Sequence, residues 1–231
     1  MQKKLFFSKK DPLILLEENK KRIINFANLH EVWWFFNNEI FNNLISKRHN
    51  LNFPDGRILS LYLKIKQERG SEITKKILLS KNSRKKKHFF IGLERKDLTK
   101  ISKITKISKQ NLNTYNPPFI SGIEFPIDER KKIIRKINKF EPYFIWACIG
   151  CPKQTILANQ IFKETNAKLF FAVGAATDFL LGKKKESPKI FIKLGIEWLY
   201  RLLTDFKYAK KKVLKHLKAL KYLKLISLNK E

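Results

Sequence analysis

Residues 149–154, IGCPKQ, place a cation and an amide directly after a run of apolar residues. Gly150 allows a sharp backbone turn, and Pro152 suits the first position of a helix. The free backbone amides at such a helix start, together with Lys153, would favour an anionic group such as a diphosphate. Gln154 can donate and accept hydrogen bonds, which suits a sugar hydroxyl, an acetamido group or a nucleobase. The alternative is a plain strand-to-helix corner with an exposed lysine.

Cys148 and Cys151 form a C-x-x-C pair, which is the spacing of a redox pair or of half a zinc site. A four-ligand zinc site needs two further ligands, and the four histidines are widely spaced in the sequence. Cys148 also lies inside the apolar run. We therefore expect two ordinary thiols near a strand end and no metal site.

Other charged residues have both a structural and a functional interpretation. Asp55 lies in a Pro-Asp-Gly tripeptide, which forms tight turns in its own right. Asp178 follows a stretch of small residues, where it would either accept hydrogen bonds from a ligand or cap the local helix. Glu197 and Arg201 are four residues apart, so on a helix they would share one face and could pair.

The pattern of apolar residues predicts the elements that position these side chains. Apolar runs bounded by turn residues alternate with helical periodicity, which is typical of a largely parallel sheet. Strands are expected at residues 22–28, 51–53, 87–93, 118–122, 143–150 and 168–174. Helices are expected at residues 31–48, 57–66, 71–80, 128–140 and 153–165, and helices alone are expected between the last strand, 168–174, and the end of the chain. The prediction is an α/β, Rossmann-like fold with helices flanking the sheet.

The pattern changes near Gly182 to helices only, with 15 basic residues against 4 acidic ones. We expect residues 1–181 to form the Rossmann-like core and residues 182–231 to form a helical, membrane-facing appendage. Apolar residues recur in this tail at helical spacing, at Ala209, Val213, Leu217, Leu220, Leu223 and Ile226. Lysines lie between them, which is the form of an interfacial membrane helix. The alternative is a helix that packs on the core and exposes a lysine face.

The charge points to an anionic partner without identifying it. The 231-residue chain has a formal net charge of +30, and only nine of its 50 basic residues are Arg. Proteins that read nucleic-acid sequence usually concentrate Arg for bidentate contacts, so nucleic acid is the least favoured partner. An anionic membrane or lipid substrate and a general compositional drift toward Lys both remain open.

Length and hydrophobicity limit the class of protein. A chain of this size with 43% hydrophobic residues can bury one sizeable α/β core, which excludes wholesale disorder. No apolar run approaches the roughly 20 residues of a membrane span. The three apolar residues near the N-terminus are too few for a signal-peptide core. We therefore expect a cytoplasmic protein, and the oligomeric state stays open.

Five short strings occur in the order and spacing of one protein family. They are FPDG at 53–56, ERGSE at 68–72, IGCPKQ at 149–154, VGAATDFLLG at 173–182 and LGIEWLYRL at 194–202. Together they make the chain similar to the WecG/TagA/CpsF family of glycosyltransferases, of the N-acetylmannosaminyltransferase type. The resemblance covers residues 50–205, and it extends more loosely back to Ile23.

The resemblance implies a fold and an activity. The fold would be a Rossmann-like core with a C-terminal segment that meets the membrane. The activity would be inverting, metal-independent transfer of an N-acetylmannosamine-type sugar from a UDP-sugar donor to a polyprenyl-diphosphate-linked acceptor, in cell-surface polysaccharide synthesis. The protein would act without a cofactor as a peripheral protein on an anionic membrane surface, at the inner face of the cell membrane. Like the family, this chain lacks an Asp-x-Asp metal string.

The resemblance also assigns site residues. Asp55 matches the proposed general base, because sugar transfer to a hydroxyl needs a carboxylate within hydrogen-bond reach of the acceptor proton. The donor-binding residues implied are Asn28, Gly150, Pro152, Lys153, Gln154, Gly174 and Asp178. The acceptor diphosphate and the membrane are expected to contact Arg69, Arg201, Lys207, Lys210, Lys211 and Lys212.

The chain departs from the family strings at several positions. Thr155 stands where the family has Glu, Glu72 stands where it has Asp, and Glu186-Ser187-Pro188 replaces its Arg-Ala-Pro. Because an acid replaces a cation at position 186, a catalytically silent relative that binds a nucleotide-sugar or a lipid head group is the second candidate. A basic nucleic-acid-binding protein, supported only by the charge, is the third.

Overall fold

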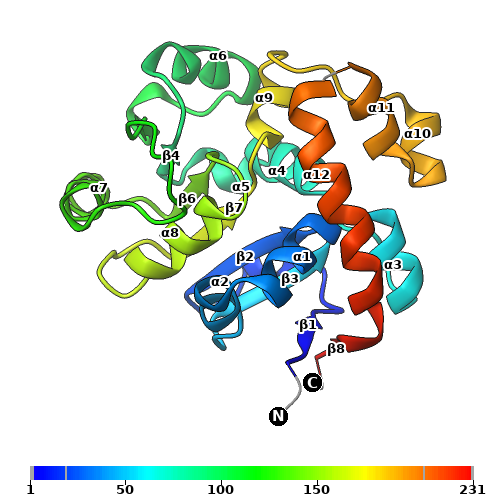
Figure 1. The fold of residues 1–231 in the computed structure, drawn as a ribbon. Helices are drawn as coiled ribbons and strands as arrows, with labels where there is room; N and C mark the ends of the chain where they lie inside the picture. The colour runs from blue at the N-terminus through cyan, green and yellow to red at the C-terminus, as the bar shows by residue number, and fades with distance from the viewer. Residues whose placement is uncertain (1–2, 19, 205, 230–231) are drawn as a thin grey trace.

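Six parallel strands form the central sheet of the structure, a computed structural model that describes residues 3–18, 20–204 and 206–229 (Figure 1). The strands are β2 (Arg22–Ala27), β3 (Asn50–Pro54), β4 (His88–Ile91), β5 (Leu112–Tyr115), β6 (Phe144–Ala147) and β7 (Leu169–Ala172). Their order across the sheet is β3-β2-β7-β6-β4-β5, with every neighbouring pair parallel. The carboxyl ends of all six strands therefore meet at one edge. The predicted α/β, Rossmann-like fold with a parallel sheet is confirmed.

Helices flank the sheet and connect its strands. They are α1 (Leu29–Asn37), α2 (Glu39–Ile45), α3 (Arg57–Leu63), α4 (Gly70–Leu79), α5 (Lys81–Arg84), α6 (Arg95–Thr105), α7 (Ile127–Phe140), α8 (Lys153–Ile161), α9 (Ala176–Leu180), α10 (Lys189–Leu194), α11 (Glu197–Thr204) and α12 (Phe206–Ala219). Three short 3-10 turns lie at Ile14–Leu16, Lys109–Asn111 and Leu220–Leu225.

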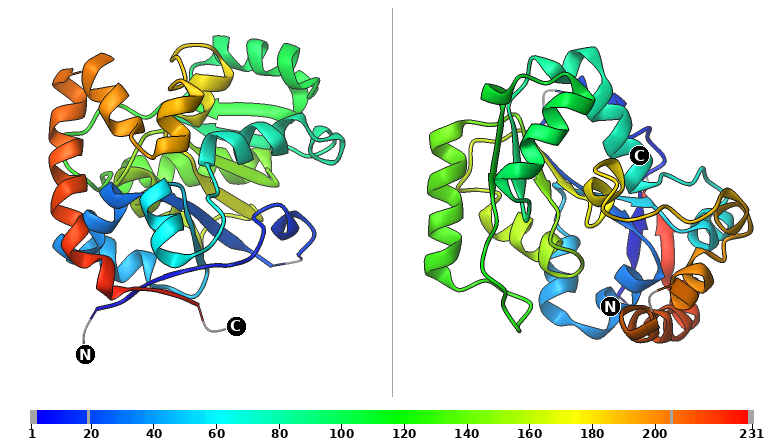
Figure 2. Two further views of the ribbon diagram at one scale, coloured as in Figure 1. Left: turned by 90° about the vertical axis from the view of Figure 1, so that its right-hand side faces the viewer. Right: turned by 90° about the horizontal axis from the view of Figure 1, so that it is seen from above.

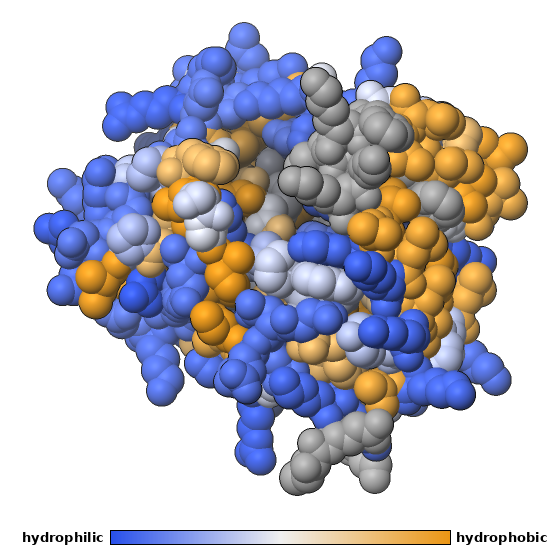
Figure 3. All heavy atoms as spheres, in the orientation of Figure 1, coloured by the Kyte–Doolittle hydropathy of each residue, from blue (hydrophilic) through white to orange (hydrophobic). Residues whose placement is uncertain are grey.

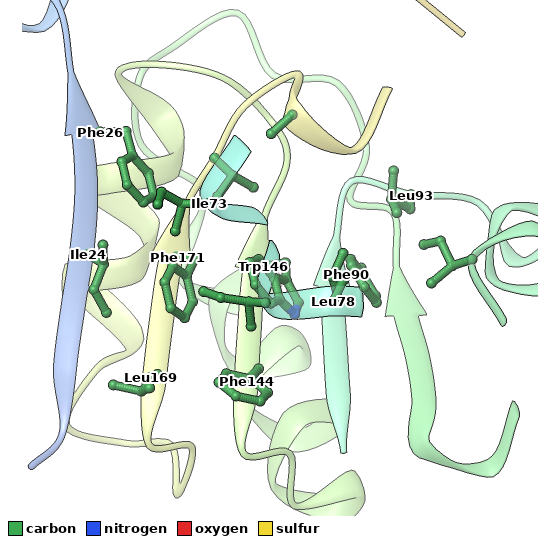
Figure 4. Packing of buried hydrophobic residues seen from close by; sticks show 14 of the residues in the cluster. Ile24, Phe26, Ile73, Leu78, Phe90, Leu93, Phe144, Trp146, Leu169 and Phe171 are labelled. Atoms are coloured by element: carbon green, nitrogen blue, oxygen red, sulfur yellow. The ribbon is translucent and has the colours of Figure 1, made fainter. Parts of the chain in front are cut away.

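Alternate residues of each strand pack on opposite faces of the sheet. Paired residues of β2, β7, β6 and β4 form one row toward α7 and α8, namely Ile23, Phe170, Ile145 and Phe89. The next row, Ile24, Phe171, Trp146 and Phe90, packs under α4 and α6 (Figure 4). Both rows are buried, which is why these strands are continuous apolar runs in the sequence.

The C-terminal segment packs against the N-terminal half of the chain. Helix α12 contacts α1, and strand β8 (Ile226–Leu228) pairs in parallel with β1 (Leu5–Phe7). Figure 2 shows the last strand beside the first one, with α10 to α12 on one side of the sheet. Ala219 and Ile226 are almost fully buried in the same core cluster as α1 and α2. The prediction of helices alone to the end is wrong for β8, because pairing with β1 satisfies an extended backbone there. The division of the chain at residues 181 and 182 stays a prediction.

Two other predicted elements differ from the structure, and one strand of the sheet was not predicted. The predicted helix 31–48 is divided into α1 and α2 at Asn38, whose side chain accepts a hydrogen bond from the Phe41 N–H at 2.8 Å and so begins a new helix. The predicted strand 118–122 is not a strand, since Phe119 is 92% exposed and the preceding prolines supply no backbone donors. The sixth strand is β5 instead. Its four residues form an edge and are too short and too polar to stand out in the sequence.

Candidate functional site

A hollow of about 310 Å³ lies over the carboxyl ends of β3, β2, β7 and β6. We call it the main hollow. Open parallel sheets bind ligands at this edge. The loops that follow these strands supply part of its lining, and residues of α1, α4, α8, α9, α11 and α12 supply much of the rest. The lining includes Asn28, His30, Glu31, Asp55, Arg69, Gly70, Gly150, Cys151, Gln154, Gly174, Lys184, Glu197, Lys212, Val213 and His216.

Asp55 follows β3 directly and is held on both its backbone and its side chain. Its N–H donates to the carbonyl of Ala27 at 2.9 Å, and its Oδ1 accepts from the N–H of Gly70 at 2.9 Å. Glycine at position 70 fits closely, because a Cβ there would lie 3.1 Å from the ring of Phe26, which would then have to shift. The Pro-Asp-Gly turn therefore presents a fixed carboxylate at the main hollow.

The surroundings of Asp55 change its acidity. Burial raises the pKa of Asp55 to about 7, and the nearby carboxylates of Glu197 and Glu31 act in the same direction. The bond from the Gly70 N–H and the charge of Arg69 act against this rise. A carboxylate that titrates near neutral pH is suited to accept a proton from a substrate hydroxyl.

The turn after β6 presents Gln154 to the main hollow. Gly150 has φ +83°, the left-handed region that favours glycine, and its carbonyl accepts from the Gln154 N–H at 3.0 Å. The Gln154 side chain is 5% exposed, and its Oε1 has no hydrogen-bond partner among the described residues. A Cβ on Gly174 would lie 3.4 Å from that oxygen. Because buried acceptors are nearly always paired, Gln154 Oε1 is where the donor group of a ligand would bind.

Asn28 links the strand-end loop after β2 to the C-terminal helix. Its Oδ1 accepts from the His30 N–H at 2.8 Å, which caps α1, and lies 3.0 Å from Nε2 of His216 on α12. Since Oδ1 is an acceptor, Nε2 of His216 donates. Burial and the charge of Lys212 lower the pKa of His216 to about 4, so the ring is neutral at pH 7.

His30, Glu31 and Cys151 are the group that could hold a metal ion in the part of the chain that the structure describes. Their ligand atoms all lie within 4.8 Å of one another. Glu31 accepts from the Asn28 N–H at 3.1 Å and interacts with the Cys151 thiol, whose pKa burial raises well above its usual value. Trp34 Nε1 donates to Nε2 of His30 at 3.3 Å. Hydrogen bonds within the protein thus already occupy these groups.

The two cysteines lie in different environments. Cys148 packs with the core cluster under α4 and α6, and Cys151 packs with the cluster of α1 and α2. Both are free thiols, and burial raises the pKa of Cys148 to about 12.

Lys153 and its neighbour Pro152 do not line the main hollow. Pro152 precedes the first residue of α8, as the sequence predicted. The Lys153 ammonium instead donates to the carbonyl of Ile120 and lies 4.9 Å from the centre of the Phe119 ring. The loop before α7 thus holds this lysine away from the position that we expected for a diphosphate contact.

Lys184 is the cation that the structure brings to the main hollow beside β7. Its Nζ lies 3.2 Å from Oδ2 of Asp178, and its side chain is half exposed. Asp178 itself does not line the hollow, so its contact with a ligand would run through Lys184. Lys212 of α12 lines the hollow as well.

Arg69 and Glu197 connect α4 with α11. Arg69 lies 2.9 Å from Glu72 and 3.6 Å from Glu197, and its side chain is 11% exposed. Glu197 also accepts from the Ser187 hydroxyl at 3.2 Å. The side chains of four other predicted contacts, Arg201, Lys207, Lys210 and Lys211, lie outside the described residues.

Sequence reasoning missed several lining residues. Glu31 had a local signal, since Asn28 and Glu31 have the spacing of a capping box, which the structure contains. Lys184 lies in a run of three lysines with nothing to distinguish it. His216 had no signal, because its partner Asn28 is 188 residues away.

The family resemblance implies a UDP-sugar donor, and on that expectation Lys184→Ala should weaken UDP binding by about 1–3 kcal/mol, the size of a charge-assisted contact. Lys153→Ala is the matched control and should leave the UDP affinity unchanged, because that ammonium binds the Ile120 carbonyl. Isothermal titration of both variants with UDP checks this. A loss of affinity only in the Lys153 variant would show that this side chain turns into the hollow when ligand binds.

The open parallel sheet with a polar hollow at its carboxyl edge defines a Rossmann-like α/β protein with a ligand site built from strand-end loops. The model of the glycosyl transferase WecG/TagA/CpsF family matches residues 13–230. The chain belongs to this glycosyltransferase family.

Relatives of known activity match a shorter stretch. Over 79 residues, the chain is 35% identical to an N-acetylglucosaminyldiphosphoundecaprenol N-acetyl-beta-D-mannosaminyltransferase of Staphylococcus aureus strain MRSA252. It is 34% identical to the enzyme of the same name from strain NCTC 8325. In both cases the match spans 34% of this chain and 31% of the relative.

Among the described residues, no helix is both long enough and apolar enough to span a bilayer.

Proposed function

We propose that this protein transfers an N-acetylmannosamine-type sugar from a UDP-sugar to a polyprenyl-diphosphate-linked acceptor. The observation that carries the proposal is Asp55, a fixed carboxylate with a pKa of about 7 at the strand-end hollow of a chain in this family. The names of the relatives from Staphylococcus aureus give the sugar and the lipid-linked acceptor.

The main hollow has suitable groups for a UDP-sugar. Gln154 Oε1 is an unpaired buried acceptor, which an N–H or O–H of the nucleotide or the sugar would satisfy. Lys184 and Lys212 would stabilise the two negative charges of the diphosphate. The backbone amides at the start of α8, after Gly150, would add partial positive charge. These groups would stabilise the departing UDP without a metal ion.

The chemical step needs one base. The acceptor hydroxyl oxygen forms a bond with C1 of the donor sugar, on the face opposite UDP, and the bond between C1 and the UDP oxygen breaks. Asp55 takes the hydroxyl proton, and UDP leaves with the electron pair. Attack from the opposite face inverts the configuration at C1. Asp55 is suited to this role because its pKa lies close to neutral pH.

A hydrophobic surface on α10, α11, α12 and the 3-10 turn that follows α12 supports contact with a membrane. Hydrophobic side chains gather over this side of the molecule in Figure 3. Its exposed members are Ile190, Leu194, Leu203, Leu214, Leu217 and Leu220, each at least 39% exposed, which we call the leucine surface. Lys189, Lys193, Lys218 and Lys221 are exposed on the same elements. Apolar side chains flanked by lysines bind anionic lipid surfaces.

The predicted stripe of the tail is only partly exposed. Leu217 and Leu220 are exposed, but Val213 lines the main hollow and Ile226 is buried in β8. The exposed Leu217 and Leu220 support the membrane-facing interpretation of the tail, and the positions of Val213 and Ile226 support the core-packing alternative. The membrane contact is therefore assigned to the leucine surface, and we propose that it holds the protein on the inner face of the cell membrane.

A transfer assay tests the proposed function. The protein is incubated with UDP-N-acetylmannosamine and N-acetylglucosaminyl diphosphate carrying a short prenyl chain, and the disaccharide product is detected by mass spectrometry. UDP binding without product would support the catalytically silent relative. Stabilisation by oligonucleotides alone, with no effect of UDP-sugars, would instead favour nucleic-acid binding and contradict the proposal.

A further inference from the structure

A second hollow of about 210 Å³ adjoins the first and shares Asn28, Asp55, Glu197 and His216 with it. We call it the side hollow. Its remaining lining comes from α1, α3, α10 and the loops beside them, and includes Arg57, Ile58 and Ile192. Asp55 therefore lies where the two hollows meet, so that ligands in both would reach its carboxylate.

Arg57 is the cation of the side hollow. Its side chain is exposed, and its guanidinium makes no ion pair with any residue that the structure describes. Its stem packs on the backbone of Gly195, where a Cβ would lie 3.1 Å from Cβ and Cγ of Arg57. Arg69 differs, because it pairs with Glu72 and Glu197 and lines the main hollow.

The surface beside the side hollow is apolar. Helices α3 and α10, which supply Arg57 and Ile192, contact each other. On these helices Leu61 is 60% exposed, Ile190 is 63% exposed and Leu194 is 65% exposed. Ile190 and Leu194 belong to the leucine surface. The side hollow, Arg57 and the leucine surface therefore lie next to one another along α3 and α10.

We infer that the side hollow binds the sugar-diphosphate end of the lipid-linked acceptor, and that Arg57 contacts its diphosphate. This inference rests on the proposed function. The sugar hydroxyl would reach Asp55 from the side opposite the UDP-sugar, as inversion requires. The planar guanidinium suits two oxygens of a phosphate, and the prenyl chain would leave over Leu61 and Leu194 toward the membrane.

Binding of the acceptor tests this assignment separately from catalysis. The probe is N-acetylglucosaminyl diphosphate on a short fluorescent prenyl chain, titrated in the presence of saturating UDP. We expect Arg57→Ala to weaken binding of the probe at least tenfold. Arg57→Lys should have a smaller effect, because lysine keeps the positive charge but cannot donate to two phosphate oxygens from one planar group. UDP affinity should change less than twofold in both variants.

Two further measurements complete the design. Arg135→Ala removes an exposed arginine from α7, outside both hollows, and controls for the loss of one positive charge. A probe with a monophosphate in place of the diphosphate should lose less affinity on Arg57→Ala than the diphosphate probe does. Equal losses for Arg57→Ala and Arg135→Ala, or equal losses for both probes, would overturn the role of Arg57.

A filling substitution tests the side hollow itself. Ile192→Trp adds a large ring to its wall and should abolish probe binding while UDP binding remains. Undiminished probe binding would exclude the side hollow. If the unmodified protein binds the probe but forms no product, the proposed transfer fails and the binding assignment stands. If the unmodified protein transfers sugar and the Arg57→Ala variant has the same KM for the acceptor, the assignment of Arg57 fails and the proposed function stands.

Discussion

Asp55→Asn should lower sugar transfer by about 100-fold to 10,000-fold while UDP binding stays unchanged. Asparagine has nearly the same shape and can still accept the bond from the Gly70 N–H, but its amide oxygen cannot take a proton. The measurement is kcat with a competent acceptor, together with UDP titration. Turnover within a few-fold of the unmodified protein would exclude Asp55 as the base.

The pH dependence provides a second test of the same residue. Transfer needs the ionised carboxylate, and burial raises the pKa of Asp55 to about 7. The rate should therefore rise with pH and level off above about pH 8. A rate that is constant between pH 5 and pH 8 would contradict the raised pKa.

The raised pKa of Asp55 also affects stability. The group titrates at about 7 in the folded chain and near 3.8 in the unfolded one, so between these values the folded state holds more protons. Its contribution to folding is therefore lost as pH rises from about 4 through 7. Asp55→Asn should raise the free energy of unfolding at pH 8, on the order of 1–3 kcal/mol, and change it little at pH 4. Chemical denaturation at both pH values measures the difference.

Replacing Leu214 and Leu217 with Asp should remove binding to anionic vesicles. Each leucine is more than half exposed on α12, so the core is untouched. Each leucine side chain that no longer inserts into the membrane should weaken the binding free energy by about 1 kcal/mol. Each added negative charge should weaken it by about 1 kcal/mol more, through repulsion from the anionic lipids. The sum of about 4 kcal/mol corresponds to a roughly 1000-fold weaker partition.

The matched control has the same charge change on another side of the molecule. Phe119 and Ile127 are also exposed, and replacing both with Asp should reduce vesicle binding only through the added charge. Sedimentation with phosphatidylglycerol vesicles at low and high salt compares the two pairs. Equal pelleting of both double variants would show that the leucine surface does not meet the membrane. Truncating the tail is a poorer test, because it would also delete the buried Ala219 and Ile226.

The local sequence was sufficient for most of the sheet and for the turn residues. Strands buried on both faces are continuous apolar runs, so β2, β4, β6 and β7 could be found without tertiary information. Asp55 and Gly150 follow β3 and β6 closely, and the carboxyl ends of parallel strands meet at one edge. For Asp55 and Gly150, their place in the sequence directly after a strand was therefore enough to predict that they lie at the hollow.

The direction of the charged side chains was decided only by tertiary structure. Lys153 follows the predicted turn, yet the loop before α7 supplies a carbonyl that binds its ammonium elsewhere. Lys184 takes a place at the hollow although nothing distinguishes it within its lysine run. A long side chain has many rotamers, and the partner that selects one of them can come from any part of the sequence.

The C-terminal segment gives the clearest contrast between sequence and structure. By itself the sequence determined that this segment is basic and periodically apolar, because both properties are local. Only the fold decided that Ile226 pairs with Leu5 in a strand, and that His216 donates to Asn28 at the hollow. Those contacts join residues roughly 190 to 220 positions apart, and a pattern read along one segment contains no information about the surface that a distant segment presents to it.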